Sequence, residues 1–293
     1  MGPHCHHGPV GSSRLALFTA KYAATTAGVL VILKIWAWLT TNAISMQASL
    51  LDSAIDCLSS ICAIFGLHFS QRPAQPPYVF GLQKVEPLVA LGQAALVVGS
   101  ALFLGTESLH RLISPEPLEN APVGLAVSLI AIVLTTFLVC VQRYAIRRTH
   151  SVIIQADSLH YRVDLFTNLG IIASLSCSHW FNIFFIDSIF GLGAALYISV
   201  GAVRLIRHSA GELLDKGLSE EESTHFQQLI EEQPGITRVL WLRTRKASTT
   251  IFIFSGVEVS VQTVPEALQI LKKAKEALKA HAQNIEVFLL LED

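Results

Sequence analysis

Residues 44–69 read ISMQASLLDSAIDCLSSICAIFGLHF, an apolar run that holds two aspartates, Asp52 and Asp56. A run of this length can cross the hydrocarbon core of a bilayer, which is about 30 Å thick and takes about 20 residues of helix. A carboxylate at that depth costs free energy unless it is paired or has a function. The long side chains of Lys and Arg can extend to the membrane surface from such a position, but the short side chain of Asp cannot. We therefore expect these two aspartates to have a function inside a membrane.

A second apolar run, residues 152–177, holds His160 and Asp164 at the same spacing of four residues. Four residues along a helix return the side chains to nearly the same face, one turn and roughly 6 Å apart. An imidazole with three carboxylates in tetrahedral geometry suits Zn²⁺ and tolerates Fe²⁺ or Cd²⁺, whereas Mg²⁺ prefers octahedral oxygen ligands. Two such helices facing each other would make one metal site, formed by Asp52, Asp56, His160 and Asp164.

Both pairs also have a plainer interpretation. Asp52 and Asp56 would then cap or line a helix end at the membrane surface. Asp157, His160 and Asp164, which share one helix face, would be a polar stripe satisfied within a helical bundle. Acidic residues are rare inside membranes, which favours a functional site for Asp52 and Asp56. The polar stripe alone would be ambiguous, but together with Asp52 and Asp56 it also favours a functional site.

Three further polar residues bear on this site. Arg162 lies roughly 200° around the helix from His160, so we expect it to pair elsewhere. Lys34, near the end of the first apolar run, is expected to extend to the outer membrane surface. Asn168, one turn after Asp164, is placed to donate the supporting hydrogen bond that a ligating carboxylate usually needs.

The composition of the whole chain is that of an integral membrane protein. Its 293 residues are 52% hydrophobic and only 15% charged, with a mean hydropathy of +0.51, which is too apolar for an ordinary soluble domain. A net charge of −1 gives no reason to expect a nucleic-acid partner, and no glycine-rich phosphate loop is present. The five cysteines form no C-x-x-C pair and are expected to be small buried hydrophobes. We predict no cofactor.

The hydropathy pattern predicts six transmembrane helices and a lipid bilayer as their surroundings. The connections after the second and fourth runs carry an excess of Arg and Lys, which places both termini in the cytoplasm. The first run lacks the flanking features of a cleaved signal peptide and is expected to be retained. The predicted spans are Leu15–Leu39, Ile44–Phe69, Val85–Leu109, Val123–Val141, Val152–Cys177 and Phe185–Leu205.

The composition becomes that of a soluble domain after about Leu205. Ser219 with three following glutamates predicts the start of a helix, and the later pattern predicts two strands, a helix over residues 264–280 and a closing strand over 285–291. The expected fold class is thus an α-helical membrane protein with a small cytoplasmic α+β domain of order α-β-β-α-β. Residues 1–13, with a short His tract, form a flexible arm, residues 14–208 the transmembrane domain, and residues 209–293 a dimerisation domain.

With these residues in view, the chain resembles the cation diffusion facilitator family, in particular the bacterial ferrous-iron and zinc efflux type. The resemblance extends from about Arg14 to Glu292 in order and spacing. It rests on SLLDSAID at 49–56, FGLQKVEPL at 80–88, SALFLGTESLHRLISPEP at 100–117, QADSLHYRVDLFTN at 155–168 and GELLDKGL at 211–218.

The resemblance implies a homodimer in the inner (cytoplasmic) cell membrane. Each protomer would carry one transport site, exchanging a divalent metal ion for protons, and Lys84 and Asp215 would form a charge interlock between protomers. An imidazole titrates near neutral pH and metal binds only its deprotonated form, so His160 suits such an exchange. The transport site would consist of Asp52, Asp56, His160 and Asp164.

The chain departs from the family pattern at the expected auxiliary metal sites. In the loop between the second and third spans the positions of the usual ligands hold Gln75, Tyr78 and Leu82, so that site is expected to be absent. Arg162 stands where the family carries an uncharged residue. In the last domain the positions of the usual ligands hold Leu240, Gly256, Leu268 and Leu290, with only Glu292 acidic.

These features leave one favoured function and one alternative. The favoured function is export of divalent metal cations coupled to protons. A metal-responsive membrane scaffold or sensor that no longer transports is the alternative, because the auxiliary sites are missing. An intramembrane aspartyl protease is disfavoured by His160 at ligand spacing, and a channel is disfavoured because a tight four-ligand site would hold its ion too long.

Overall fold

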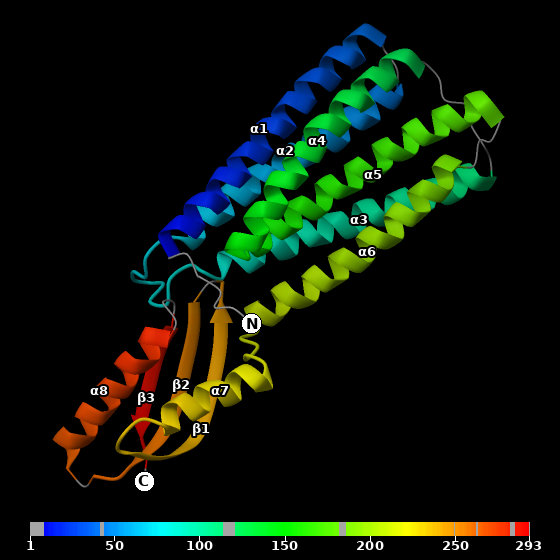
Figure 1. Ribbon diagram of the computed structural model, residues 1–293. Helices are drawn as coiled ribbons and strands as arrows, with labels where there is room; N and C mark the ends of the chain where they lie inside the picture. The colour runs from blue at the N-terminus through cyan, green and yellow to red at the C-terminus, as the bar shows by residue number, and fades with distance from the viewer. Residues whose placement is uncertain are drawn as a thin grey trace. The chain divides into compact units, whose positions relative to one another are not determined.

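The computed structural model describes residues 9–41, 44–113, 121–181, 186–248, 250–261, 263–281 and 285–292. The His tract before residue 9 lies outside these ranges. The chain forms two compact units, one of residues Ser12–Ser209 and one that contains Ala210–Asp293. The first unit is helical, and the second combines two helices with a sheet (Figure 1).

Six long helices form the first unit. Five of them are long and apolar enough to cross a membrane, namely all but α5. The α5 helix is of similar length, but Asp157, Arg162 and Asp164 make its first half polar. The helices are α1 (Pro9–Thr41), α2 (Ile44–Ser70), α3 (Val85–Ile113), α4 (Ala121–Thr149), α5 (Val152–Phe181) and α6 (Ile186–Leu213).

Small residues let these helices approach closely. The main core of the unit includes Ala63, Ala90 and Ala156, from α2, α3 and α5, all almost fully buried. Close helix contacts of this kind are typical of membrane proteins, because small side chains let backbones approach. A Cβ atom added at Gly66 of α2 would lie 2.8 Å from Ile153 Cδ1 of α5, so a larger residue there would require the Ile153 side chain to shift. The α5 helix contacts α2, α3 and α4 and is thus central to the unit.

The start of α5 is fixed by a carboxylate from α3. The buried Glu86 accepts hydrogen bonds from Ser151 Oγ at 2.5 Å and from the backbone N–H of Val152 at 3.2 Å. An acidic group at a helix N-terminus satisfies an otherwise unpaired N–H and interacts favourably with the helix dipole. The register of α5 relative to α3 is therefore set at this point.

The second unit has the element order that the sequence predicts. Its elements are α7 (Glu220–Glu231), β1 (Ile236–Ala247), β2 (Thr250–Val259), α8 (Val264–His281) and β3 (Ile285–Leu291). The predicted helix start is confirmed, since Ser219 and Glu222 form a capping box. The sheet order is β1-β2-β3, with β1 antiparallel to β2 and β2 parallel to β3.

One face of this sheet carries the core, and the other carries aromatic side chains. Ile253, Val257 and Val287 are fully buried in the core together with residues from α7 and α8. Because side chains alternate along a strand, Phe254 of β2 and Phe288 of β3 project from the opposite face. Their rings stack there, with centroids 4.9 Å apart.

Candidate metal centre

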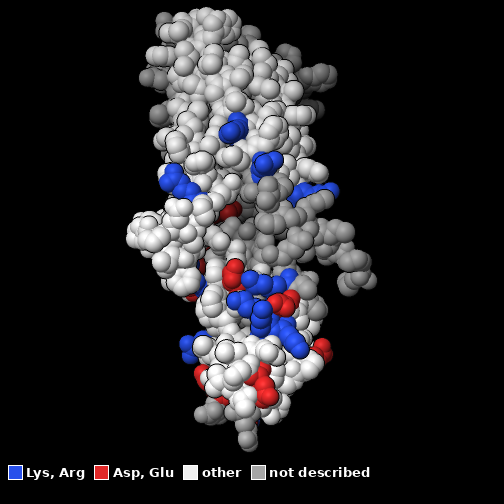
Figure 2. Space-filling view, turned by 90° about the vertical axis from the view of Figure 1, so that its left-hand side faces the viewer, with Lys and Arg blue, Asp and Glu red and all other residues white. Residues whose placement is uncertain are grey.

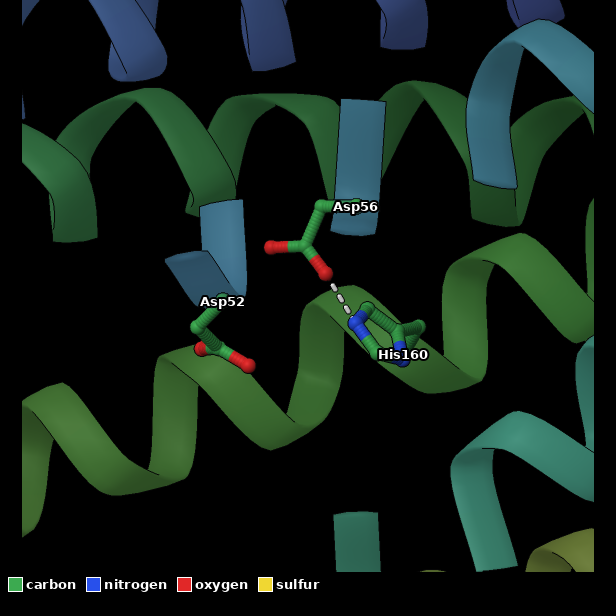
Figure 3. A group of neighbouring side chains, drawn as sticks. All are labelled: Asp52, Asp56 and His160. Atoms are coloured by element: carbon green, nitrogen blue, oxygen red, sulfur yellow. Dashed lines mark ion pairs between the residues drawn. The ribbon is translucent and has the colours of Figure 1, made fainter. Parts of the chain in front are cut away.

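The helices α2 and α5 bring three of the four predicted ligands together. One ligand atom each from Asp52, Asp56 and His160 lies within 4.8 Å of the others (Figure 3). Asp56 and His160 are 4% and 5% exposed, whereas Asp52 is exposed. This is the one group of three or more His, Cys, Asp and Glu residues with this geometry in the part of the chain that the structure describes. Two carboxylates and an imidazole at this separation can bind one metal ion.

Asp56 and His160 point directly at each other. Asp56 Oδ1 and His160 Nε2 form an ion pair, which Figure 3 marks by a dashed line. Neither atom has a hydrogen-bond partner in the described ranges. Two buried electronegative atoms in contact need a proton or another cation between them. The same two atoms are the ligand atoms that a metal ion would use.

Asp164 lies one turn beyond His160 on α5. It is half-buried and is not one of the three residues whose ligand atoms converge within 4.8 Å. Asn168 Nδ2 donates to the backbone oxygen of Asp164 at 2.6 Å, and this bond holds the backbone of the helix. The expected support of the carboxylate by Asn168 is therefore not the contact that forms, and the role of Asp164 as a fourth ligand stays a prediction.

Asp157, one turn before His160, has different partners. Its Oδ1 accepts a hydrogen bond from Ser60 Oγ at 2.9 Å, and its Oδ2 accepts one from Gln142 Nε2 at 2.8 Å. The Ser60 hydroxyl also lies 2.8 Å from the hydroxyl of Tyr161. All four residues are buried. This network connects α5 to α2 and α4. Both carboxylate oxygens of Asp157 already accept hydrogen bonds, so we do not expect Asp157 to bind metal.

The sequence interpretation did not identify Ser60 and Gln142. Each is a polar residue in an otherwise apolar run, which is the signal that marks a buried polar contact in a membrane protein. Their partner could not be named from one helix alone, because it is 97 residues away from Ser60 in sequence.

The expectation for Lys34 was wrong. Its Nζ donates to Ser53 Oγ at 2.6 Å, so the side chain points to α2 and does not extend to the membrane surface. Ser53 is buried and directly follows Asp52. A polar partner within reach stabilises the ammonium better than the longer path to water, and it puts a cation beside the acidic group.

The two residues predicted to interlock the protomers lie in different units. Asp215, two residues after the end of α6, has a positive φ of 56°, and its Oδ1 accepts a hydrogen bond from Arg245 Nη1 of β1 at 3.2 Å. Lys84 directly precedes α3 and is half-buried. Asp215 thus has a partner within its own unit, and a contact with Lys84 of a second protomer stays a prediction.

Three of the positions expected to depart from the family pattern have defined contacts in the structure. Gln75 and Tyr78 form a β-bridge in the loop between α2 and α3. In the second unit, a Cβ atom added at Gly256 would lie 2.4 Å from Trp241 Nε1, so the tryptophan covers this position. The same Nε1 donates to both carboxylate oxygens of Glu292, at 3.0 and 2.9 Å. A tryptophan hydrogen-bonded to Glu292 therefore packs over Gly256, one of the positions where the resemblance implies a metal ligand.

Comparison with known proteins agrees with this arrangement. Residues 20–214 match the family model described as the cation efflux transmembrane domain, and residues 218–292 match the cytoplasmic domain of cation efflux proteins. The chain belongs to the cation efflux family. The predicted resemblance to cation diffusion facilitators is thereby confirmed, and this cation efflux protein is a member of a transporter family, not an enzyme.

Two relatives named as cation-efflux pumps are similar to most of this chain. The chain is 36% identical over 260 residues to the cation-efflux pump FieF of Yersinia pestis (strain Pestoides F). It is equally similar to the pump of the same name from Yersinia pseudotuberculosis serotype O:3 (strain YPIII). The aligned region covers 88% of this chain and 86% of each relative. This cation efflux protein is thus a multi-pass membrane protein with a cytoplasmic C-terminal domain.

Proposed function

We propose that this cation efflux protein is a proton-coupled antiporter that exports divalent metal cations from the cytoplasm, with Zn²⁺ as the first candidate and Fe²⁺ and Cd²⁺ as further candidates. The observation that carries the proposal is the convergence of Asp52, Asp56 and His160 within apolar helices. Carboxylate and imidazole ligands suit Zn²⁺, and a charged group in a membrane helix marks an ion pathway. Asp164, one turn from His160, is proposed as the fourth ligand.

The contact between Asp56 and His160 supports exchange of metal for protons. We propose that, without metal, a proton on His160 Nε2 faces Asp56 Oδ1, because these two atoms are in contact. Metal binding at these atoms requires that the proton leave, because metal ligands must be deprotonated. When the metal departs on the other side, the imidazole takes up a proton again. One site would then alternate between the two cargoes.

We further propose that α5 is a sixth transmembrane helix and that both termini are cytoplasmic. The polar residues of α5 do not argue against a membrane span, since Asp157 and His160 are buried among neighbouring helices. Intramembrane polar groups are tolerated where they face the interior of a bundle. The proposed location is the inner cell membrane, in keeping with the basic residues Arg72 and Lys84 between α2 and α3 and with those near the end of α4, Arg143, Arg147 and Arg148.

The proposed active form is a homodimer. Support comes from the C-terminal domain, which matches the cytoplasmic dimerisation domain of cation efflux proteins. The Lys84–Asp215 interlock is part of this proposal and would join the two protomers near the membrane.

Transport by purified protein in sealed liposomes tests the proposal. A zinc gradient should drive zinc flux with opposite proton flux, measured by metal- and pH-sensitive dyes, and an opposing pH gradient should accelerate it. Asp164→Ala should abolish flux if Asp164 is the fourth ligand, because a three-ligand remnant loses affinity that offsets ion dehydration. Zinc binding without any flux in the unmodified protein would instead establish a scaffold or sensor.

A further inference from the structure

A groove between α5 and α6 is separate from the metal centre. It has a volume of about 380 Å³ and is lined largely by apolar side chains. Two guanidinium groups interrupt this lining, Arg162 from α5 and Arg204 from α6. The other lining residues are Leu159, Gly193, Leu196, Tyr197, Val200 and Gly201.

The two arginines have no countercharge in the described part of the chain. Neither forms an ion pair or hydrogen bond with another residue described there. Arg162 Nε is also shielded from solvent and has no hydrogen-bond partner in these ranges. Arg204 is exposed, so the cost of desolvation falls on Arg162, and two like charges that line one groove also repel each other. An anion between them would reduce both costs.

The depth of the groove agrees with the position of lipid phosphates. Residues 188–203 of α6 carry no charged side chain, and Arg204 is the first one after them. Sixteen residues of helix rise about 24 Å, close to the thickness of the hydrocarbon core of about 30 Å. Arg204 therefore lies near an edge of the core, and long Arg side chains extend towards the headgroups from such positions.

The walls of the groove suit an acyl chain. Leu196 is 69% exposed and Val200 is 52% exposed, so this side of α6 faces outward from the unit. A Cβ atom added at Gly193 would meet nothing within 4 Å, which leaves open space along the helix. The ring of Tyr197 contacts that of Phe166 with centroids 5.4 Å apart and so fixes one side of the opening.

We propose that this groove binds an anionic phospholipid. Its phosphate lies between Arg162 and Arg204, and an acyl chain follows Leu196 and Val200 past Gly193. Arg binds phosphate through a planar fork of N–H donors, and basic residues at a membrane surface attract anionic lipids. This site is independent of metal transport and would hold whether or not the proposed antiport mechanism is correct.

Native mass spectrometry of the full-length protein in detergent tests the site. Phosphatidylglycerol and phosphatidylcholine with identical acyl chains are titrated separately. Each guanidinium near an anionic headgroup contributes about 1 kcal/mol, so phosphatidylglycerol should bind about thirtyfold more tightly. The double variant Arg162→Gln/Arg204→Gln should bind both lipids equally. Arg207→Gln, on the same helix but outside the groove, should retain the preference.

A second variant reduces the free volume of the groove and leaves both arginines in place. Gly193→Leu should fill the open space and weaken binding of phosphatidylglycerol at least tenfold. Gly99→Leu is the matched control, because a Cβ atom added at Gly99 of α3 also meets nothing within 4 Å. Elution as a single symmetric peak in size-exclusion chromatography confirms that each variant is folded.

Four outcomes would overturn the proposal. They are equal affinity for the two lipids in the unmodified protein, a preference that survives the double substitution, and an unchanged affinity in Gly193→Leu. The fourth is displacement of the lipid by millimolar inorganic phosphate, which would identify a site for free anions. Dissociation of a dimer by the arginine substitutions, with no change in lipid preference, would assign the groove to a partner protomer instead.

Discussion

At the scale of single residues, we expect His160 to set which metal the site prefers. It would supply the single nitrogen ligand among carboxylates, and it faces Asp56 directly. His160→Asp should lower the zinc flux relative to the manganese flux by at least tenfold, because sites made only of carboxylates suit harder ions. Competition between the two metals in liposomes measures the ratio. An unchanged ratio would show that His160 does not touch the metal.

Asp157 differs from the ligands because its carboxylate is already satisfied. Gln142→Leu would leave Asp157 Oδ2 without its donor, and an unsatisfied buried acceptor costs about 1–3 kcal/mol. We expect a lower melting temperature in detergent for this variant. Asp157→Asn should retain zinc binding in isothermal titration, whereas Asp56→Asn should lose most of it. Equal loss in both would mean that Asp157 also serves as a ligand.

The sequence predicted the charged residues of the centre better than their neutral partners. Spacing alone brings Asp52 beside Asp56 on one helix face, because helix geometry is fixed. The contacts of Lys34 and Asp157 depend on which helices are neighbours, and one helical pattern does not contain that information. A neutral donor such as Gln142 also adds little to a hydropathy profile.

At the scale of helices, apolar runs locate five candidate membrane spans but not the helix ends. The fourth run was expected to end at Val141 and the sixth at Leu205, yet α4 continues to Thr149 and α6 to Leu213. The extra two turns carry Arg147, Arg148 and Arg207, which prefer water. A helix does not need to stop where the hydrocarbon stops, because its backbone hydrogen bonds are internal.

The start of α5 gives a prediction at this scale. Glu86→Ala removes the acceptor of the Val152 N–H and of the Ser151 hydroxyl, and loss of a helix cap costs about 0.5–2 kcal/mol. Amide hydrogen exchange over residues 152–156 should accelerate, while exchange in α6 stays the same. Glu86→Gln retains an acceptor oxygen and should show a smaller effect. Equal protection in all three proteins would mean that Glu86 does not hold this end of α5.

At the scale of the whole molecule, two units with different chemistry belong to one chain. Charged side chains are sparse over the upper, helical part of the face in Figure 2 and dense over its lower part. The two units differ in amino-acid composition because a surface in contact with lipid is apolar, whereas a surface in contact with water carries polar and charged side chains. The order of strands in the second unit is harder to predict from the sequence, because the parallel pairing of β2 with β3 depends on the crossover through α8.

The last prediction concerns what holds two copies together. Of the positions in the second unit where the resemblance implies metal ligands, only Glu292 is acidic, and two of the others, Leu268 and Leu290, are 56% and 52% exposed. If such side chains meet across the interface, dimerisation rests on apolar burial and does not require metal. A ligand stabilises an assembly only if it binds that assembly preferentially.

The full-length protein in detergent should therefore show the same dimer dissociation constant in chelator and in excess zinc, as measured by analytical ultracentrifugation. Leu290→Glu should weaken the dimer at least tenfold, whereas Lys279→Glu, an exposed change on α8, serves as a control for altered charge. Tightening by zinc that disappears in Glu292→Gln would contradict this view. Glu292 would then have to leave Trp241 to bind metal, and the pair would be a zinc-dependent switch.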